Sequence, residues 1–321
     1  MTATVPESRA SGTGCRAVRA VRAVRPRLRG VAETVDSVLI VFNPGSTGDA
    51  DTLARRLRGE LAAVRPELPV ELRPTEYAGH ARDIAREAAS GPGRPLIVSA
   101  SGDGGYNEVV NGIMDVPDAE AAAAVLPAGN ANDHDRVTSR RPLHDAILDG
   151  RTEQMDLLAL TLGDAPVRYA HSYIGFGLTP VVALQIEEGG KGTVREIVST
   201  FRSFWAFTPF RLRFTDGNVR RVDNLLLANI SEMAKVAEVS EGRPDDGRFE
   251  VILMEHRPKW RVLFTAVRAA VRGLGPQPTA EDFRFTALDP MPVQIDGEVD
   301  DVGADTAVQV RIAAGVLSVI R

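Results

Sequence analysis

The sequence predicts a two-domain α/β protein: a doubly wound parallel sheet comes first and a β-rich, sandwich-like domain follows. Short apolar runs alternate with helix-period segments up to about residue 150, a pattern typical of parallel strands joined by helices. After Arg151 the segments resemble strands separated by Asp-Gly and Gly-Asp turns. With 321 residues, 44% hydrophobic and 25% charged, the chain is long enough for two separate cores.

The expected elements follow this division. In the first half we expect strands at 37–42, 69–72, 95–98 and 122–126, and helices at 51–64, 79–89 and from Asn107 onward. In the second half we expect strands at 154–162, 167–174, 210–215, 219–230, 248–254, 283–288, 293–295 and 306–320. Two helices, at 193–206 and 259–272, interrupt them. The apolar face of the first either packs in the core or forms a wall of an apolar ligand cavity.

We place the domain boundaries where the composition and the patterning change. Residues 1–34 repeat Arg-Ala-Val, and Glu7 is their only acidic residue before Glu33. This stretch is either a disordered extension or an Arg-rich arm attracted to anionic lipid. The α/β domain then covers 35–155 and the β-rich domain 156–308, while a final strand at about 309–321 can return to the first domain.

Composition excludes several classes of protein. The net charge of -5 and the pI near 5.7 argue against nucleic-acid binding, which relies on an excess of Lys and Arg. The single cysteine, Cys15, cannot form an internal disulfide or a cysteine-based metal site, which suits a cytoplasmic location. Because no apolar run reaches the roughly 20 residues of a membrane-spanning helix, we expect a soluble or peripherally membrane-associated protein.

The segment around Ser101 predicts a phosphate-binding turn. An apolar strand at 95–98 is followed by Gly102, Gly104 and Gly105, and then by helix-period residues from Asn107. Glycines let the backbone approach a ligand closely, and a helix start offers unpaired N–H groups. The alternative is a tight turn without a ligand. Asp103 would repel phosphate unless a cation such as Mg²⁺ mediates; its alternative role is that of a turn former or helix cap.

Two further loops are expected beside this turn. The first strand is followed by NPGSTG at 43–48, which is rich in small hydrogen-bond donors, and the fourth by LPAGNANDHDR at 126–136. In a doubly wound sheet, ligands bind at the carboxyl ends of the strands, where all three loops are expected to lie. The five histidines show no metal-ligand spacing, and we assign none of them a catalytic role.

These motifs together resemble the diacylglycerol kinase catalytic-domain family, which includes bacterial lipid kinases and sphingosine kinases. The resemblance covers nearly everything from residue 36 onward. It is carried by NPGSTG, TEYAGHARDIARE at 75–87, SGDGGYNEVVNG at 101–112, LPAGNANDHDR, DDG at 245–247 and IDGE at 295–298. The resemblance implies a nucleotide-binding domain like that of NAD kinase and phosphofructokinase, followed by a lipid-substrate domain. It also implies transfer of the γ-phosphoryl group of ATP, with Mg²⁺, to diacylglycerol or a related lipid alcohol.

The family pattern implies a set of site residues. Nucleotide binding is expected at Asn43, Pro44, Gly45, Ser46, Thr47, Gly48, Thr75, Ser101, Gly102, Asp103, Gly104, Gly105, Asn107, Glu108, Gly129 and Asn130. Metal binding is expected at Asp103 and Asp246. Glu298 corresponds to the usual general base, which accepts the proton of the attacking alcohol, and Asp296 and Asp103 are the alternatives for that role. The alternative for the whole IDGE segment is a plain hairpin turn.

The sequence departs from the family pattern in two of these loops, at three positions in all. The central turn of the family usually reads G-G-D-G-T, and here Ser101 and Gly105 occupy its first and last positions. Asn130 stands where the family usually has Thr. An amide can still donate to phosphate.

Because of these departures, other functions stay open. One is a non-catalytic or weakly active nucleotide- or lipid-binding regulatory protein. A relative of NAD kinase or phosphofructokinase is disfavoured, because LPAGNAND and IDGE are not expected there. The expected partner is a lipid at a membrane surface, with no nucleic acid. The lipid's identity and the oligomeric state, including a homodimer, stay open.

Overall fold

The computed structural model describes residues 35–46, 48–130, 132–177, 208–233, 237–238, 242–258 and 275–321. The Arg-rich extension, Thr47 and the helices expected at 193–206 and 259–272 lie outside these described residues. In the part of the chain that is described, no helix has the length and apolar character needed to cross a bilayer.

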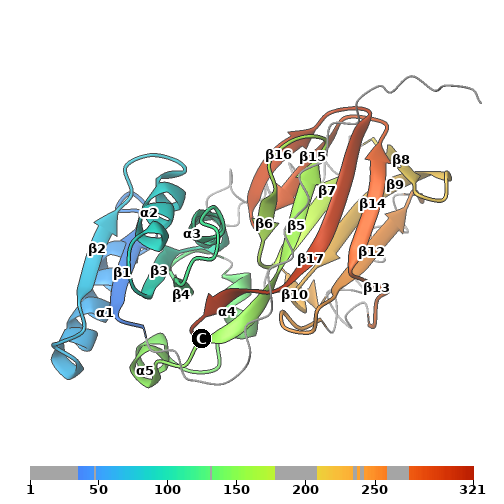
Figure 1. The fold of residues 1–321 in the computed structure, drawn as a ribbon. Coiled ribbons are helices and arrows are strands. Elements are labelled where there is room, and N and C mark those ends of the chain that lie inside the picture. Colours follow the sequence, from blue (N-terminus) through green and yellow to red (C-terminus); the bar gives the residue numbers. More distant parts are fainter. Residues whose placement is uncertain are drawn as a thin grey trace, which may run out of the picture.

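The N-terminal lobe is a parallel β-sheet with helices on both faces (Figure 1). Its strands are β1 (Ser37–Phe42), β2 (Val70–Pro74), β3 (Pro95–Ser101) and β4 (Ala122–Pro127). Its helices are α1 (Ala50–Val64), α2 (His80–Ser90), α3 (Asp103–Met114), α4 (Asp133–Thr138) and α5 (Leu143–Asp149). The sheet order β2-β1-β3-β4, with every neighbouring pair parallel, confirms the predicted doubly wound domain.

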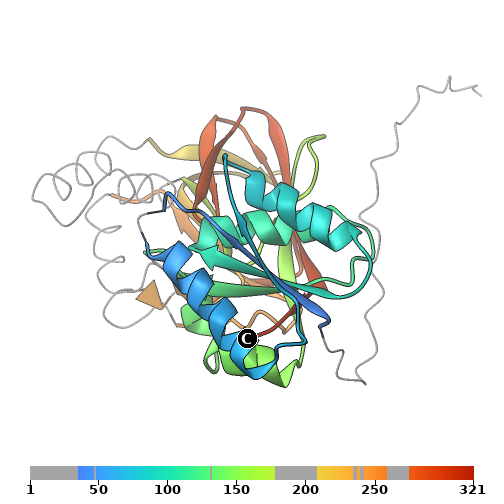
Figure 2. The same cartoon turned by 90° about the vertical axis from the view of Figure 1, so that its left-hand side faces the viewer.

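Two apolar clusters cover the two faces of this sheet, and α1 and α2 lie on opposite sides of it in Figure 2. Leu57 of α1 packs with Ile40 on one face, and Val110 of α3 packs with Ile97 on the other. Since both faces are covered, the central strand β3 is buried along almost its whole length. A rigid, buried strand thus holds the glycine turn that follows it.

Helix α3 begins at Asp103 rather than at Asn107, so the predicted helix start was too late. Gly104 and Gly105 lie in the first turn of the helix. Because glycine is flexible, the sequence predicted that the loop would continue through them. A Cβ on Gly104 would lie 3.7 Å from Cγ of Glu298. The burial of α3 against the sheet outweighs the modest cost of glycine inside the helix.

The C-terminal lobe is strand-rich and predominantly antiparallel, as predicted. Its strands are β5 (Glu153–Leu162), β6 (Arg168–Ala170), β7 (Tyr173–Gly177), β8 (Phe210–Phe214), β9 (Val219–Ala228), β10 (Glu232–Met233), β11 (Ala237–Glu238), β12 (Phe249–Glu255), β13 (Thr279–Ala280), β14 (Asp282–Ala287), β15 (Met291–Ile295), β16 (Glu298–Val302) and β17 (Thr306–Val319). Phe176, Phe249 and Phe285 belong to its buried apolar core.

The strand expected at 167–174 is divided into β6 and β7. The break falls at His171 and Ser172, whose backbone N–H groups donate to the carboxylate of Asp296 instead of a neighbouring strand. The pattern of apolar residues along one segment cannot predict this long-range contact.

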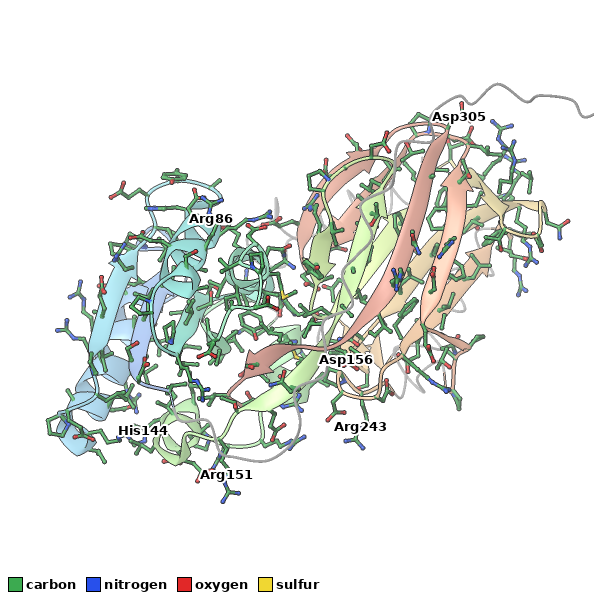
Figure 3. All side chains as sticks on the ribbon, in the orientation of Figure 1. Arg86, His144, Arg151, Asp156, Arg243 and Asp305 are labelled. Carbon is green, nitrogen blue, oxygen red and sulfur yellow. The ribbon has the colours of Figure 1, made fainter. Side chains whose placement is uncertain are left out.

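Strand β17 belongs to both lobes, and Figure 1 shows it running from the β-rich lobe to the parallel sheet. Its first part pairs antiparallel with β14 and β5, and its end pairs parallel with β4 through Ser318 and Val319. The pairing with β5 shifts register between Ala313 and Leu317. There Asp156, between the lobes in Figure 3, accepts backbone N–H groups of Gly315 and Gly247, both at 2.6 Å.

Candidate active site

Three loops converge at the carboxyl ends of β1, β3 and β4, and glycines permit the contact between them. A Cβ on Gly129 would lie 2.4 Å from Cα of Gly102, and one on Gly48 would lie 2.0 Å from the carbonyl oxygen of Ala128. Any larger side chain at these positions would push the loops apart. The glycines therefore let bare backbone line one shared surface, which suits a phosphate group.

An open cleft of about 580 Å³ lies over these loops. Ten of the residues expected to bind nucleotide line it: Asn43, Ser46, Gly48, Thr75, Ser101, Gly102, Gly105, Glu108, Gly129 and Asn130. The described residues Pro44, Gly45, Asp103, Gly104 and Asn107 are not among the lining residues. The structure thus gathers most of the predicted set from four separate chain segments into one site.

Ser101 occupies space that a side chain at Gly105 would need. A Cβ on Gly105 would lie 2.6 Å from the Ser101 hydroxyl oxygen and 2.7 Å from its Cβ. The hydroxyl is also 2.7 Å from that of Ser99 and donates to the carbonyl of Gly102. The hydroxyl missing at position 105 is thus replaced by one from position 101 on the same side of the turn.

Glu108 has a supporting contact in addition to its place in the cleft wall. Its two carboxylate oxygens accept the backbone N–H groups of Gly79 and Ala81, each at 3.1 Å. These N–H groups belong to the start of α2, where a carboxylate is favoured. Glu108 therefore holds the loop that carries Thr75 against the glycine turn.

Asp103 also accepts N–H groups from a helix start. Its carboxylate oxygens lie 3.1 Å from the backbone nitrogens of Asp133 and His134, at the start of α4. The carboxylate thus joins the β3 turn to the β4 loop. Each oxygen keeps a lone pair, so the same carboxylate could still take one further ligand.

Asp296 is fully buried, and its carboxylate is saturated with donors. One oxygen accepts the N–H groups of Ser172 and Tyr173, and the other accepts the N–H of His171 and the side-chain amide of Asn107. The residue itself has a positive φ of 47°, held in place by these contacts. Asp296 ties the β15–β16 hairpin to α3, which makes it a positioning group rather than a free base.

A buried polar cluster, formed by Tyr106, His134, His171 and Ser172, lies behind the turn. The Ser172 hydroxyl is 2.7 Å from Nδ1 of His171 and 3.2 Å from Nδ1 of His134, and the two imidazole rings are 4.5 Å apart. Nε2 of His171 lies 3.2 Å from the carbonyl oxygen of Asp103. Burial holds the pKa of His134 well below its usual range.

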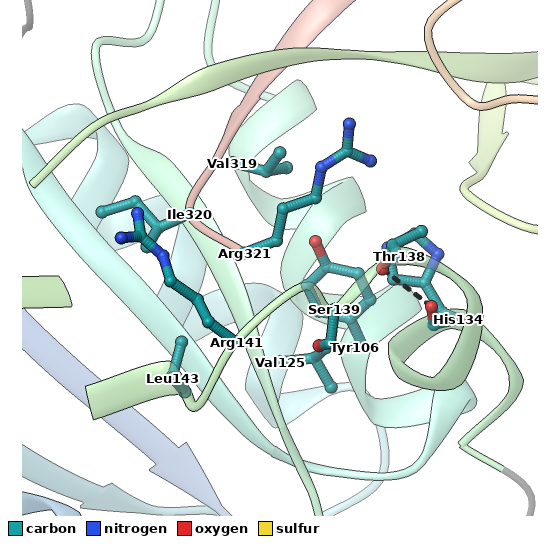
Figure 4. Close-up of a pocket in the computed structure, with 10 residues that line it drawn as sticks. All are labelled: Tyr106, Val125, His134, Thr138, Ser139, Arg141, Leu143, Val319, Ile320 and Arg321. Carbon is teal, nitrogen blue, oxygen red and sulfur yellow. Dashed lines mark hydrogen bonds between the residues drawn. The ribbon is translucent and has the colours of Figure 1, made fainter. Parts of the chain in front are cut away.

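Sequence reasoning missed this buried cluster because His134 and His171 are far apart in the chain. Figure 4 shows the small cavity of about 10 Å³ next to it, lined partly by Tyr106, His134 and Arg321. That volume suffices for about one water molecule, so the cavity is not a substrate site. Through the contact of His171 with the carbonyl of Asp103, the cluster supports the glycine turn.

Glu298 lies at the front of the turn, at the start of α3. Its side chain keeps 41% exposure, with Cγ 3.7 Å from the Cβ position of Gly104. Burial and the nearby carboxylate of Glu108 raise the pKa of Glu298, whereas Arg168, 3.5 Å away, lowers it. Glu298 is thus a partly exposed carboxylate with a raised pKa beside the glycine turn, as a general base requires.

Asp246 lies at a different place. It is exposed in the turn before β12, next to Gly247, whose N–H donates to Asp156. Burial of Asp156 raises the pKa of that carboxyl, and the negative charge of Asp246 adds to the rise. Among the residues that the structure describes, no three His, Cys, Asp or Glu side chains gather as a metal site, and Asp246 is not in the cleft lining.

Together, the fold and this cleft define a two-lobed α/β protein with a phosphate-suited site. Residues 37–160 match the family model of the diacylglycerol kinase catalytic domain. This part of the chain is therefore similar to that domain, and the resemblance seen in its motifs is confirmed.

The similar proteins point to lipid kinases. Human sphingosine kinase 1 is 31% identical over 213 residues, 60% of this chain and 55% of that protein. A diacylglycerol kinase of Staphylococcus epidermidis is 28% identical over 178 residues, 50% of this chain and 52% of that protein. A probable lipid kinase, YegS-like, of Chromohalobacter salexigens is 26% identical over 253 residues, 71% of this chain and 76% of that protein. The match thus spans about half the length of the first two relatives.

A solved structure shows the same fold. A putative diacylglycerol kinase from Bacillus anthracis superposes with a TM-score of 0.67 at 19% identity, covering 89% of this chain and 98% of that one. At this identity the likeness supports the two-lobed fold alone.

Proposed function

We propose that the protein is an ATP-dependent lipid kinase that transfers the γ-phosphoryl group to the hydroxyl of diacylglycerol or a related lipid alcohol. The observation that carries this proposal is the position of Glu298. Its side chain lies beside Gly104 at the start of α3, next to the turn whose residues Ser101, Gly102 and Gly105 line the cleft, although Glu298 itself is not one of the lining residues. A proton acceptor and a phosphate-suited surface therefore meet at one helix terminus.

The residues present fit a nucleotide triphosphate. The cleft is lined by backbone of the close-packed glycine loops and by Thr75 and Asn130, whose side chains can donate to phosphate oxygens. Asp103 supplies a single carboxylate at the edge of this surface, and Mg²⁺ commonly binds through one or two carboxylates together with substrate phosphates. Bound there, Mg²⁺ would neutralise charge on the transferring group. A metal role for Asp246 at its separate turn stays a prediction.

Glu298 would accept the proton of the lipid hydroxyl as the alcohol oxygen bonds to the γ-phosphorus and the bond to the ADP oxygen breaks. Asp296 holds the hairpin that carries Glu298, through its contacts with α3 and the 171–173 backbone. Arg168 keeps Glu298 ionised against the opposing effects of burial and Glu108. Because the acceptor is a lipid, we propose that the protein works at a membrane surface and associates with it peripherally.

A labelling assay tests this function directly. Purified full-length protein is incubated with radiolabelled ATP, Mg²⁺ and vesicles containing diacylglycerol within a mixed lipid extract. We expect a labelled lipid product that disappears when Mg²⁺ is chelated. ATP binding without any labelled lipid would favour the regulatory alternative, and absence of both would contradict the proposal.

A further inference from the structure

We infer that the exposed ring of Tyr77 is a stacking platform for the purine base of the nucleotide, an inference that rests on the proposed function. Tyr77 is 57% exposed, one of the few large hydrophobic side chains so exposed in the described part of the chain. An exposed aromatic ring beside a cleft is a candidate contact for a ligand.

The ring of Tyr77 is held rigidly. It stacks on His80 with 4.3 Å between the ring centroids and 10° between the planes. Its hydroxyl donates to Asp83 at 3.1 Å, and Nδ1 of His80 accepts the backbone N–H of Glu76 at 3.0 Å. Both rings are thus fixed at their polar ends, so a ligand would lose little conformational entropy in ordering them.

Tyr77 is also one of the residues that line the cleft. Two hollows meet at this residue: the cleft itself and an outer hollow of about 410 Å³ along α2. Tyr77 lines both, but His80 lines only the outer one. Because His80 covers one side of the ring, the side toward the cleft is left for a planar group.

The distance along the chain also suits a nucleotide. Thr75, expected to contact phosphate, stands two residues before Tyr77, and both line the same cleft as the glycine turn. A nucleotide with its phosphates over that turn would extend its base toward the loop at 75–78. Stacking on a π-face is tolerant of base identity, so the platform predicts use of purine nucleotides more than selection of adenine.

Isothermal titration calorimetry of the full-length protein with Mg²⁺-ATP and with Mg²⁺-tripolyphosphate tests the platform. Tripolyphosphate reports the phosphate contacts without a base. We expect Tyr77→Ala to weaken ATP binding roughly tenfold while changing tripolyphosphate binding by less than about twofold, because only stacking is lost. Tyr77→Phe, which keeps the ring, should retain most of the ATP affinity.

Arg86, labelled on α2 in Figure 3, provides the matched control, because of the two hollows it lines only the outer one. Arg86→Ala should leave both affinities unchanged; an equal loss of ATP binding in this variant would place the base in the outer hollow and overturn the inference. An equal weakening of both ligands by Tyr77→Ala would make Tyr77 a brace of the loop and overturn it too. If the wild-type protein binds neither ligand, the proposed function itself fails.

Discussion

The side chain of Ser101 fills the space that a side chain at position 105 would need. A Cβ on Gly105 would lie 2.6 Å from the Ser101 hydroxyl oxygen and 2.7 Å from the Ser101 Cβ. Rotation of the serine hydroxyl cannot relieve the second contact, because Cβ is fixed to the backbone. The two departures from the family pattern in this turn are therefore coupled: a serine at position 101 requires glycine at position 105. A hydroxyl is thus kept in the cleft wall, with its proton donated to the carbonyl of Gly102.

This coupling predicts a non-additive pair of substitutions. Gly105→Thr alone should lower the free energy of unfolding by about 1–3 kcal/mol, because it overpacks the turn. Adding Ser101→Gly should remove most of that loss. Urea denaturation of both single variants and the double variant, treated as a double-mutant cycle, measures the coupling. Additive effects would show that the two positions are independent.

Glu298→Gln should abolish lipid phosphorylation while leaving the urea midpoint unchanged, because the carboxylate is partly exposed and its role is chemical. Asp301→Asn, on the same strand and exposed, is the matched control and should retain activity. Turnover by Glu298→Gln comparable to that of the control would move the role of base to Asp296 or Asp103.

The pH dependence of turnover should report on Glu298. A base acts only when ionised, so activity should rise with pH through its raised pKa. Removing the positive charge in Arg168→Gln disfavours the carboxylate and should move this acidic limb to higher pH. Turnover at saturating substrate, measured across pH, tests the shift; a limb that moves to lower pH would contradict the assigned contact.

Asp296→Asn should be a stability variant. The four donors around the carboxylate would meet an amide that offers only one accepting oxygen, so about 2–4 kcal/mol of unfolding free energy should be lost. Urea denaturation measures this loss. A variant with unchanged stability and no turnover would instead identify Asp296 as a chemical participant.

His134 should make the fold sensitive to acid. Its pKa is lowered in the folded state, so below about pH 6.5 the unfolded chain binds a proton that the folded chain does not. Stability should therefore fall as the pH drops, by up to about 1.4 kcal/mol per pH unit. Urea midpoints against pH should show a shallower slope in His134→Gln. A slope kept in that variant but lost in His144→Gln would contradict the assignment.

Local patterns predicted most of the fold. Buried strands such as β1 and helices such as α1 were found because their apolar residues repeat along the chain. The start of α3 was missed because glycines usually continue a loop, and the break between β6 and β7 was missed because it depends on a contact with the distant Asp296. The polar cluster of His134 and His171 was missed for the same reason: its members come from segments that only the tertiary structure brings together.

Because one continuous strand, β17, is hydrogen-bonded into both lobes, the lobes do not form two bodies on a loose tether. Any opening between the glycine turn and the strand-rich lobe would have to bend or twist this shared backbone, most easily at the irregular stretch near Gly315. The distance across which a phosphoryl group would be transferred is thus fixed mainly by the strand that the two lobes share. An acceptor would have to fit that distance.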